Sequence, residues 1–385
     1  MRLAPEQESV LNGESGSSLA LAMKTLVAYG QAFGAERLVP IESAHLAGSF
    51  GVSVYKAYYK IIDQLVNEGA RVKVPTTINP RPGNDLNLVN RAVFSAQKRF
   101  ESQMKALGVT PNYSCVCYEG ANVPEFGQRL AWAESSAVQF ANSALGARTN
   151  RNSVLVDLCS AVTGLTPEFG YLLDENRRGK IRVKLRIDRM DASALGYVIG
   201  QKAVDRVPVI EHYEFSRVEL KNMGGAMAAA GGVALFHVEG LTPEAPDMKT
   251  VFEAEPEETI TVAQEDLDAL RARKPERAGM VVFGCPQMTY DETVAIAERI
   301  AGKKVKLPTW LCVVPEAKKR FEETELCQRV RAAGVEVFEH CPLAALTIRL
   351  WGKRVLTSSG KCFYYLDGSD YGTVDDCLSA AGALS

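Results

Sequence analysis

Two cysteines stand where apolar, strand-like segments end, and this placement points to metal chemistry. Cys285 and Cys341 each follow such a segment, and a third segment of this kind runs into Ser359 and Lys361. The cysteines lack the short paired spacing from which structural zinc sites are built. Thiolates held singly on separate strands are better suited to an iron–sulfur cluster. Such a cluster is normally bound by four cysteine thiolates. A cluster with three protein thiolates would leave one iron open to a substrate.

The same cysteines have other interpretations. Cysteine is among the most buried residue types, so Cys285 and Cys341 are equally well explained as small core residues that follow strands. A nucleophilic pair of His340 and Cys341 is disfavoured, because neighbours on a strand point to opposite faces. Cys115 and Cys117 are too close in sequence to suit two ligands of one metal.

Composition and charge are those of an ordinary globular enzyme. The chain has 385 residues, of which 46% are hydrophobic and 23% charged, and its net charge of −2 indicates no nucleic-acid partner. The first residues lack the pattern of a secretion signal, and no apolar run reaches the ~18 residues of a membrane span. We therefore expect a cytoplasmic protein without membrane contacts. Its nine cysteines are odd in number and should stay reduced in that compartment.

The N-terminal segments alternate between helix and strand. Periodicity predicts helix, strand, helix and strand in turn over residues 17–33, 38–41, 54–70 and 71–75. His45 follows the first of these strands, and Thr77 and Asn79 follow the second. Ligands of parallel α/β sheets bind beyond the carboxyl ends of the strands. We therefore expect these three side chains to lie near a bound molecule.

The alternation continues through the middle of the chain. Helices are predicted over 86–107, 125–151, 192–204 and through 224–232, and strands over 180–187, 207–211 and 233–238. A Pro- and Glu-rich composition favours a connection between lobes at 251–274. The predicted domains are an N-terminal α/β lobe, 1–250, and a C-terminal α/β domain, 275–385, which carries Cys285 and Cys341.

The last third of the chain has the clearest pattern. Strands are predicted over 278–284, 306–314, 335–340 and 354–357, with helices over 291–302 and 316–334. In a right-handed parallel arrangement, the carboxyl ends of these strands line one edge of one sheet. That edge, with its two cysteines and the segment 358–361, is the predicted site. The fold class is α/β with parallel-rich sheets.

Nucleotide-binding loops are missing from the sequence. It contains neither the P-loop pattern nor the Gly-x-Gly-x-x-Gly pattern, and no helix is predicted after the Ser-Ser-Gly-Lys segment 358–361. The small residues of 224–232 favour close packing between helices instead. A nicotinamide enzyme is therefore disfavoured.

A series of motifs occurs in a fixed order along the chain. They are LNGESG (11–16), IESAHLAG (41–48), VPTTIN (74–79), ESSAVQFANSALGARTNR (134–151), ENR (175–177), FHVEGLTPEA (236–245), FGCP (283–286), HC (340–341) and SSGK (358–361). Together they resemble the large, catalytic subunit of the aconitase X family over essentially the whole chain. The resemblance implies an aconitase-like multi-domain α/β/α assembly with an iron–sulfur cluster at the domain interface. It also implies a small swivelling-domain subunit as partner, since no such part is found here.

The resemblance also assigns the cluster ligands. Cys115, Cys285 and Cys341 match the family's cysteines, so the expected cofactor is a 4Fe–4S or 2Fe–2S cluster with an open iron site. The chain departs from the family at two positions. Cys117 stands where a proline is common, which leaves open whether it can replace a ligand. Gln287 stands where a histidine is common, so no acid–base role follows for that position.

The implied reaction is the loss of water from a β-hydroxy acid, as in a hydro-lyase. Iron would act as a Lewis acid on the leaving hydroxide, while a positioned base removes a carbon-bound proton. Catalytic candidates are Lys361, His45 and Glu134, and a serine on the partner is a further candidate for the base. Arg148 suits a bidentate contact with the substrate carboxylate, although a structural ion pair is the alternative. The other predicted substrate-binding residues are Ser135, Asn150, Thr77, Asn79 and Ser359.

Two substrates are known in the family, cis-3-hydroxy-L-proline and mevalonate 5-phosphate. The first is favoured, because a phosphate substrate should leave a basic or glycine-rich cradle in the sequence. The alternative is mevalonate 5-phosphate, with this chain as the large subunit of the dehydratase. A protein of another class, an iron sensor that binds RNA, is disfavoured by the near-neutral charge.

Overall fold

The computed structural model describes residues 1–48, 56–83, 86–271, 277–347 and 354–383. The chain forms two compact units. Unit 1 comprises Met1–Asn79 and Asn84–Arg178, and unit 2 comprises Pro80–Gly83 and Gly179–Ser385. The boundary near residue 178 differs from the predicted connection at 251–274, of which the described part, residues 251–271, lies in unit 2.

Two elements of unit 2 occupy the predicted connection. Strand β9 (Glu258–Ala263) pairs in parallel with β6 (Ile181–Arg186), and helix α11 (Gln264–Asp268) follows it. The Pro- and Glu-rich residues end just before β9. Within β9 the buried Ile260 and Val262 alternate with the exposed Thr259 and Thr261, as in a half-buried strand.

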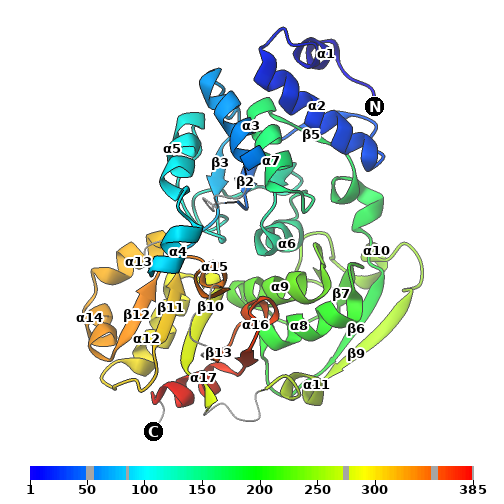
Figure 1. The fold of residues 1–385 in the computed structure, drawn as a ribbon. Coiled ribbons are helices and arrows are strands. Elements are labelled where there is room, and N and C mark those ends of the chain that lie inside the picture. Colours follow the sequence, from blue (N-terminus) through cyan, green and yellow to red (C-terminus); the bar gives the residue numbers. More distant parts are fainter. Residues whose placement is uncertain (49–55, 84–85, 272–276, 348–353, 384–385) are drawn as a thin grey trace. The chain divides into compact units, whose positions relative to one another are not determined.

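Unit 1 consists of short strands among helices (Figure 1). Its helices are α1 (Pro5–Leu11), α2 (Ser17–Ala32), α3 (Lys56–Asn67), α4 (Leu88–Val93), α5 (Gln97–Leu107), α6 (Ser135–Ser143) and α7 (Val154–Thr163), with short 3-10 helices η1 (Gly170–Leu172) and η2 (Asp174–Arg177). Its strands are β1 (Leu38–Pro40), β2 (Ser43–Leu46), β3 (Thr76–Ile78), β4 (Leu130–Trp132) and β5 (Leu165–Pro167). Strands β3, β2 and β4 form a parallel sheet in that order, and β1 pairs antiparallel with β5.

An apolar core fixes this sheet against its helices. Leu26 of α2, Ile62 of α3, Phe100 of α5 and Leu158 of α7 are fully buried in one cluster with Leu46 of β2. The helix predicted over 17–33 is thereby confirmed as α2. Burial of these side chains is the main favourable contribution to the stability of unit 1.

Three predictions for unit 1 were wrong about where an element lies or about its type. The strand expected over 71–75 lies instead at β3, because Val72 and Lys73 donate their N–H groups to residues outside the sheet. The helix predicted over 86–107 is divided into α4 and α5. The helix predicted over 125–151 contains strand β4 before α6. Strands of three residues are too short for a periodic pattern to identify.

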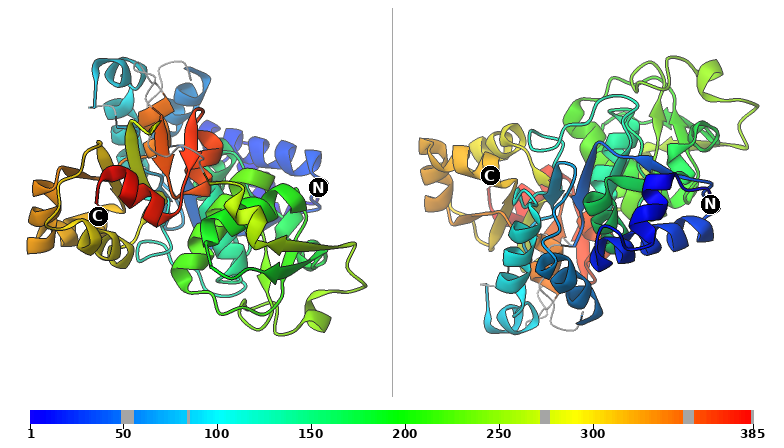
Figure 2. Two further views of the ribbon diagram at one scale, coloured as in Figure 1. Left: turned by 90° about the horizontal axis from the view of Figure 1, so that it is seen from below. Right: turned by 90° about the horizontal axis from the view of Figure 1, so that it is seen from above.

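Unit 2 contains two parallel sheets with helices packed against them (Figures 1 and 2). Its remaining helices are α8 (Ala192–Ala203), α9 (Arg217–Gly231), α10 (Met248–Val251), α12 (Tyr290–Ile300), α13 (Pro315–Glu322), α14 (Glu325–Ala332), α15 (Pro342–Thr347), α16 (Gly360–Tyr365) and α17 (Val374–Ala381). Its remaining strands are β7 (Pro208–Ile210), β8 (His237–Val238), β10 (Met280–Met288), β11 (Thr309–Val313), β12 (Val335–Phe338), β13 (Val355–Thr357) and β14 (Ser369–Tyr371). No helix in the described residues is both long and apolar enough to cross a membrane.

The larger sheet of unit 2 confirms the arrangement predicted for the last third of the chain. Its strands are parallel throughout and lie in the order β12-β11-β10-β13-β14. Helix α12 connects β10 to β11, and helix α16 connects β13 to β14, so the two connections run toward opposite ends of the sheet. Because both connections are right-handed, the two helices lie on opposite faces. The C-terminal helix α17, red in Figures 1 and 2, packs on β10 and β13. The strand order therefore reverses between β10 and β13.

The smaller sheet of unit 2 is built in the same way. Its order is β8-β7-β6-β9, and its neighbouring strands are parallel. The chain enters at β6, continues outward to β8 and returns to the other side of β6 with β9. Its strand order therefore reverses between β6 and β9.

Two predictions for the last third were wrong. The helix expected over 316–334 is divided into α13 and α14, because Thr324 caps a new helix by accepting the N–H of Cys327. A helix, α16, does follow β13, and the Ser359 hydroxyl caps it by accepting the N–H of Cys362 at 3.0 Å. Side-chain caps of this kind begin short helices that periodicity does not reveal.

Helices α8 and α9 of unit 2 pack together through glycine. A Cβ atom at Gly196 would lie 2.0 Å from the carbonyl oxygen of Met223, and one at Gly231 would lie 1.9 Å from that of Gly200. Only glycine fits at such distances. The small residues of 224–232 therefore serve helix packing, as predicted.

Replacing Gly196 by alanine should destabilise unit 2. The added methyl group would push α8 away from α9, and overpacking of this kind typically lowers the free energy of unfolding by ~1–3 kcal/mol. Urea denaturation measures the change. Gln201→Ala, on the exposed face of α8, is the control. Equal stability of Gly196→Ala and the wild type would contradict the close helix contact.

Candidate active site

The carboxyl ends of the unit 1 sheet carry four of the predicted site residues. His45 lies in β2, where Thr77 of β3 is its register partner. Asn79 follows β3, and Glu134 follows β4 as the N-cap of α6. All four side chains are buried, and Glu134 has the largest exposed fraction at 9%.

A continuous series of hydrogen bonds joins these residues. Thr77 Oγ1 lies 2.8 Å from His45 Nδ1, and Asn79 Oδ1 lies 2.8 Å from His45 Nε2. Asn79 Nδ2 donates to Glu134 Oε2 at 2.7 Å. The other Glu134 oxygen accepts from the N–H and hydroxyl of Ser136. The structure thus brings together polar residues that lie far apart in the sequence.

The partners of Asn79 decide which nitrogen of His45 carries the proton. Asn79 Nδ2 also donates to the carbonyl of Ala47 at 3.3 Å, and a carbonyl can only accept. Asn79 Oδ1 therefore faces His45 Nε2, which must be the N–H donor. His45 Nδ1 then accepts from the Thr77 hydroxyl. These contacts hold the imidazole neutral, with its proton on Nε2.

Burial reinforces the neutral form of His45. Desolvation lowers the pKa of this fully buried side chain to about 4, although the bond to Asn79 and the charge of Glu134 act in the opposite direction. The ring of Trp132 packs edge-on against the imidazole, with centroids 5.9 Å apart. The side chain of His45 has no exposed surface, so its expected contact with a bound molecule stays a prediction.

Two residues extend this network beyond the predicted set. Asn122 Nδ2 donates to Thr77 Oγ1 at 3.1 Å and to the carbonyl of Ala44 at 3.0 Å. The buried side chain of Cys117 is also hydrogen-bonded to Thr77, and burial raises the pKa of its thiol well above the usual range. Asn122 lies in a loop without periodic pattern, so no sequence signal pointed to it. We call His45, Thr77, Asn79, Asn122 and Glu134 the His45 network.

Arg148 and Asn150 have structural partners in unit 1. The Arg148 guanidinium pairs with Asp174 at 2.5 Å, which is the ion pair that the sequence left as an alternative. Asn150 donates to the carbonyl of Phe169 at 2.9 Å and accepts the N–H of Tyr171 at 2.8 Å. Both side chains stabilise the same turn. Their contact with a substrate stays a prediction.

In unit 2, Cys285 and Ser359 flank the point where the strand order of the larger sheet reverses. Cys285 lies in β10 and Ser359 follows β13, the neighbouring strand. The Ser359 hydroxyl donates to the carbonyl of Cys285. The N–H of Gly360 donates to the Ser193 hydroxyl at 2.7 Å, which links this edge to the first turn of α8. Ligands of open α/β sheets bind at such reversal points.

Cys341 and Lys361 belong to the same sheet edge. Cys341 follows β12, and its N–H donates to the carbonyl of Arg81 at 2.7 Å. Its sulfur accepts the N–H of Ala344 at 3.5 Å. Lys361 is the second residue of α16 and is 5% exposed. The edge therefore combines two thiols with a buried amine.

A cavity of about 580 Å³ reaches this edge inside unit 2. Cys285 and Ser359 lie on its wall, together with the first turn of α8 and parts of α11, α12 and α17. Three arginines line it as well, Arg189, Arg271 and Arg299. A molecule in this cavity would contact the predicted edge directly.

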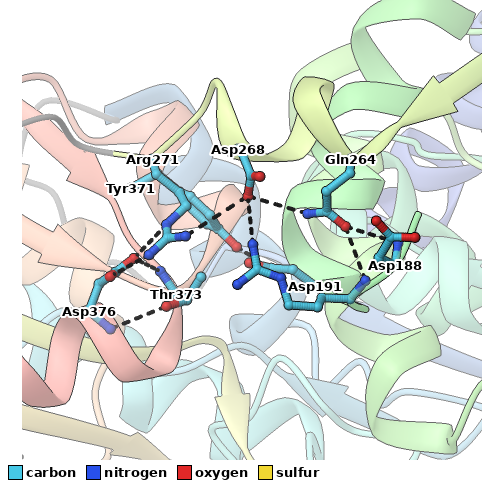
Figure 3. A network of polar contacts seen from close by, with 9 residues as sticks. Asp188, Asp191, Gln264, Asp268, Arg271, Tyr371, Thr373 and Asp376 are labelled. Carbon is cyan, nitrogen blue, oxygen red and sulfur yellow. Dashed lines mark hydrogen bonds and ion pairs between the residues drawn. The ribbon is translucent and has the colours of Figure 1, made fainter. Parts of the chain in front are cut away.

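The smaller sheet of unit 2 contributes polar contacts to this cavity where its own strand order reverses (Figure 3). Gln264 follows β9, and Asp188 and Arg189 follow β6. The side-chain oxygen of Gln264 accepts the N–H groups of these two residues at 3.1 and 3.0 Å. The amide of Gln264 thus joins the two strand ends.

The same network joins the two sheets of unit 2 (Figure 3). Arg271 makes a bidentate contact with Asp376, at 2.9 and 2.7 Å, and lies 3.9 Å from Asp268. Tyr371 donates to Asp191 at 2.6 Å. Burial raises the pKa of Asp191 despite this hydrogen bond. Burial, together with the charge of Asp191, raises the pKa of Tyr371 well above its usual value. None of these residues was singled out from the sequence.

The three predicted cluster cysteines do not form a ready metal site among the described residues. In the described residues, no three His, Cys, Asp or Glu side chains gather at one metal-binding point within a unit. Cys115 belongs to unit 1, whereas Cys285 and Cys341 belong to unit 2. None of the three forms a disulfide bond.

Family models match the chain along almost its whole length. Those of the aconitase X first, second and third domains match residues 1–175, 178–272 and 278–383. The chain belongs to the aconitase X family. The first family domain corresponds to unit 1, and the second and third share unit 2.

The chain is similar to relatives that carry two different enzyme names. A Methanosarcina mazei protein, named phosphomevalonate dehydratase large subunit, is 37% identical over 99% of this chain and 97% of its own length. A Pseudomonas aeruginosa cis-3-hydroxy-L-proline dehydratase is 28% identical over 95% of this chain and 67% of its own length. The crystal structure of Thermococcus kodakaraensis aconitase X in its holo-form is 34% identical, covers 95% of both chains and has a TM-score of 0.86. The predicted aconitase-like α/β fold is confirmed.

Both kinds of relative are dehydratases, and the chain is accordingly a hydro-lyase of the aconitase X family. This confirms the class of reaction expected from the sequence motifs. The two names differ in the substrate.

The lowered pKa of His45 predicts how stability depends on pH. The unfolded chain binds a proton near pH 6.5 and the folded chain near pH 4, so the contribution of His45 is complete above pH 6.5 and is lost as the pH falls toward 4. This loss amounts to roughly 3 kcal/mol. The free energy of unfolding, measured in urea between about pH 7.5 and 4.5, should fall more steeply in the wild type than in His45→Gln.

The control is Gln201→Ala, because this exposed side chain of α8 has no titratable group. It should leave the slope against pH unchanged. Parallel slopes for the wild type and His45→Gln would contradict a buried neutral imidazole.

Proposed function

We propose that this chain is the large, catalytic subunit of a phosphomevalonate dehydratase, which removes water from mevalonate 5-phosphate. The observation that carries the proposal is the 37% identity to the M. mazei large subunit along 99% of this chain and 97% of that relative. The P. aeruginosa hydroxyproline enzyme is less similar, at 28% identity. The proposal therefore reverses the substrate preference drawn from the sequence, and cis-3-hydroxy-L-proline becomes the second candidate.

The earlier preference rested on the missing glycine-rich phosphate loop. Phosphate is also recognised by arginine, whose guanidinium donates two parallel hydrogen bonds to it. A phosphate substrate therefore does not require such a loop.

The proposed cofactor is an iron–sulfur cluster held by Cys115, Cys285 and Cys341. The donor chemistry fits, because none of the three is in a disulfide bond, Cys285 lies on a cavity wall, and the sulfur of Cys341 accepts an amide N–H. When bound, the cluster would supply a Lewis-acidic iron for the leaving hydroxyl group. We do not assign Cys117 as a ligand, because its side chain is bonded to Thr77 inside unit 1.

We assign the His45 network to proton handling. Glu134 ends the series of hydrogen bonds, and its oxygens are held by Asn79 and Ser136, with a longer contact to Ser135 at 3.4 Å. A carboxylate fixed in this way can take a proton at a defined position. His45 orients Asn79, and through it Glu134, without touching the substrate.

At the edge of unit 2 we assign Lys361 to the negative charge of the substrate. A buried ammonium group attracts an anion more strongly than an exposed one, because less water screens it. Ser359 has a positioning role, since its hydroxyl is bonded to the carbonyl of Cys285. Of the further predicted contacts, Thr77 is fully engaged in the His45 network, so Ser135 is the better candidate to meet a substrate.

We further propose a small subunit as partner. The M. mazei relative is itself named a large subunit. The chain spans only 67% of the length of the P. aeruginosa relative, so that protein contains a further part. A second protein that carries the equivalent part would complete the enzyme.

Replacing a proposed ligand should lower the iron content of protein purified without oxygen. Cys115→Ser, Cys285→Ser and Cys341→Ser should each lose most of the bound iron and sulfide, because the cluster has no spare protein ligand. Cys117→Ser and Cys327→Ser should keep both. Iron and sulfide analysis per mole of chain measures this. A full complement of iron in any of the first three variants would remove that residue from the ligand set.

Activity measurements separate the two substrates. Combined with the small subunit encoded by the same genome, the chain should dehydrate mevalonate 5-phosphate with a kcat/KM at least ~100-fold above that for cis-3-hydroxy-L-proline, because a site built for a phosphate leaves buried donors unpaired without it. Product formation is followed by NMR without oxygen. The opposite order would support the second candidate. An enzyme that holds an intact cluster but dehydrates neither compound would refute both candidate functions.

A further inference from the structure

Gln287 lies two residues after Cys285, and its buried side chain joins the ends of three strands. The amide nitrogen donates to the carbonyl of Glu339 at 2.7 Å and to that of Val313 at 3.3 Å. Val313 ends β11, and Glu339 follows β12, two residues before Cys341. The amide therefore connects the segment that carries one proposed ligand to the segment that carries another.

An amide is the side chain best suited to this place. Its NH₂ group has two hydrogens, and each of the two carbonyls accepts one. A neutral histidine carries a single N–H. A carboxylate would place oxygen against oxygen. Gln287 thus occupies a bridge that needs two donors from one group.

The backbone of Gln287 is held from another element. Lys221 of α9 donates to the Gln287 carbonyl at 3.1 Å and pairs with Glu292 of α12 at 2.9 Å. Asn222 donates to the second oxygen of Glu292 at 3.1 Å. Lys221 is 3% exposed, so these contacts are screened little by water. They fix the end of β10 and with it the direction of the Gln287 side chain.

The turn that carries Cys341 is held as well. The N–H of Cys341 donates to the carbonyl of Arg81, and the side chain of Glu339 pairs with Lys318 at 2.9 Å. Each proposed ligand of unit 2 thus lies on a segment with its own supports. The amide of Gln287 spans the gap between these two segments.

We propose that Gln287 is a positioning residue that sets the spacing between the Cys285 and Cys341 thiols. The inference rests on the proposed function, in which both cysteines bind the cluster. A cluster fixes the distances between its ligand sulfurs, so a frame that holds the two strand ends in place binds it with less rearrangement. Gln287 itself transfers no proton and contacts no substrate. Its effect appears in how the cluster is held.

Two substitutions test this on the full chain, reconstituted with iron and sulfide without oxygen. Gln287→Met keeps the length of the side chain but removes both donors, and Gln287→Glu keeps the shape but replaces the NH₂ group by oxygen. Both variants should lose iron to a chelator at least ~10-fold faster than the wild type and show an altered cluster EPR spectrum. Gln201→Met and Gln201→Glu place the same changes on the exposed face of α8 and should match the wild type.

Thermal unfolding of the cluster-free variants separates positioning from folding. Should Gln287→Glu fail to fold, Gln287→Met carries the test. Iron release and EPR spectra equal to those of the wild type would overturn the proposal, even where the melting temperature falls. A wild-type chain that binds neither iron nor sulfide would instead overturn the ligand assignment, and with it the proposed cluster.

Discussion

Reversal of strand order within a parallel sheet is the constraint on which this molecule depends. Right-handed connections carry the chain outward from a starting strand and then return it to that strand's other side. Strands β2, β6 and β10 each begin a sheet and end up with a neighbour on both sides. The connecting helices diverge at such a strand, and its carboxyl end faces a crevice. The polar groups found there are His45, Asn79 and Glu134, then Asp188, Arg189 and Gln264, and finally Cys285 and Ser359.

Burial at these reversal points determines which hydrogen bonds must form. A polar group removed from water is costly unless it finds a partner, so each network closes on itself. In unit 1 this requirement fixes the orientation of Asn79 and the tautomer of His45, and it leaves the imidazole neutral. In unit 2 it pairs Lys221 with Glu292 and directs the amide of Gln287 at two carbonyls. Groups held in this way are prepared for a ligand before it arrives.

The last third of the chain was predictable from its sequence, and the first third only in part. Strands β10 to β12 have four to nine residues and alternate with amphipathic helices, so periodicity identified them and placed Cys285 and Cys341 at one edge. The unit 1 sheet is built from strands of three or four residues. Strands this short carry little periodic signal, and here β3 was displaced and β4 was hidden in a predicted helix. His45 and Asn79 were nevertheless singled out, because each comes after a predicted strand, although His45 lies within β2 and the strand predicted before it is β1, which belongs to another sheet.

The sequence by itself determined the family, the α/β class and the presence of thiols and polar side chains at strand ends. These are properties of residue type and of order along the chain. Only the tertiary structure decided where the side chains point. Arg148 turns to Asp174, Asn122 reaches Thr77, and Gln287 bonds to a carbonyl 52 residues away. The direction of a hydrogen bond depends on which distant segment the fold brings within about 3 Å, and no spacing in the sequence records that.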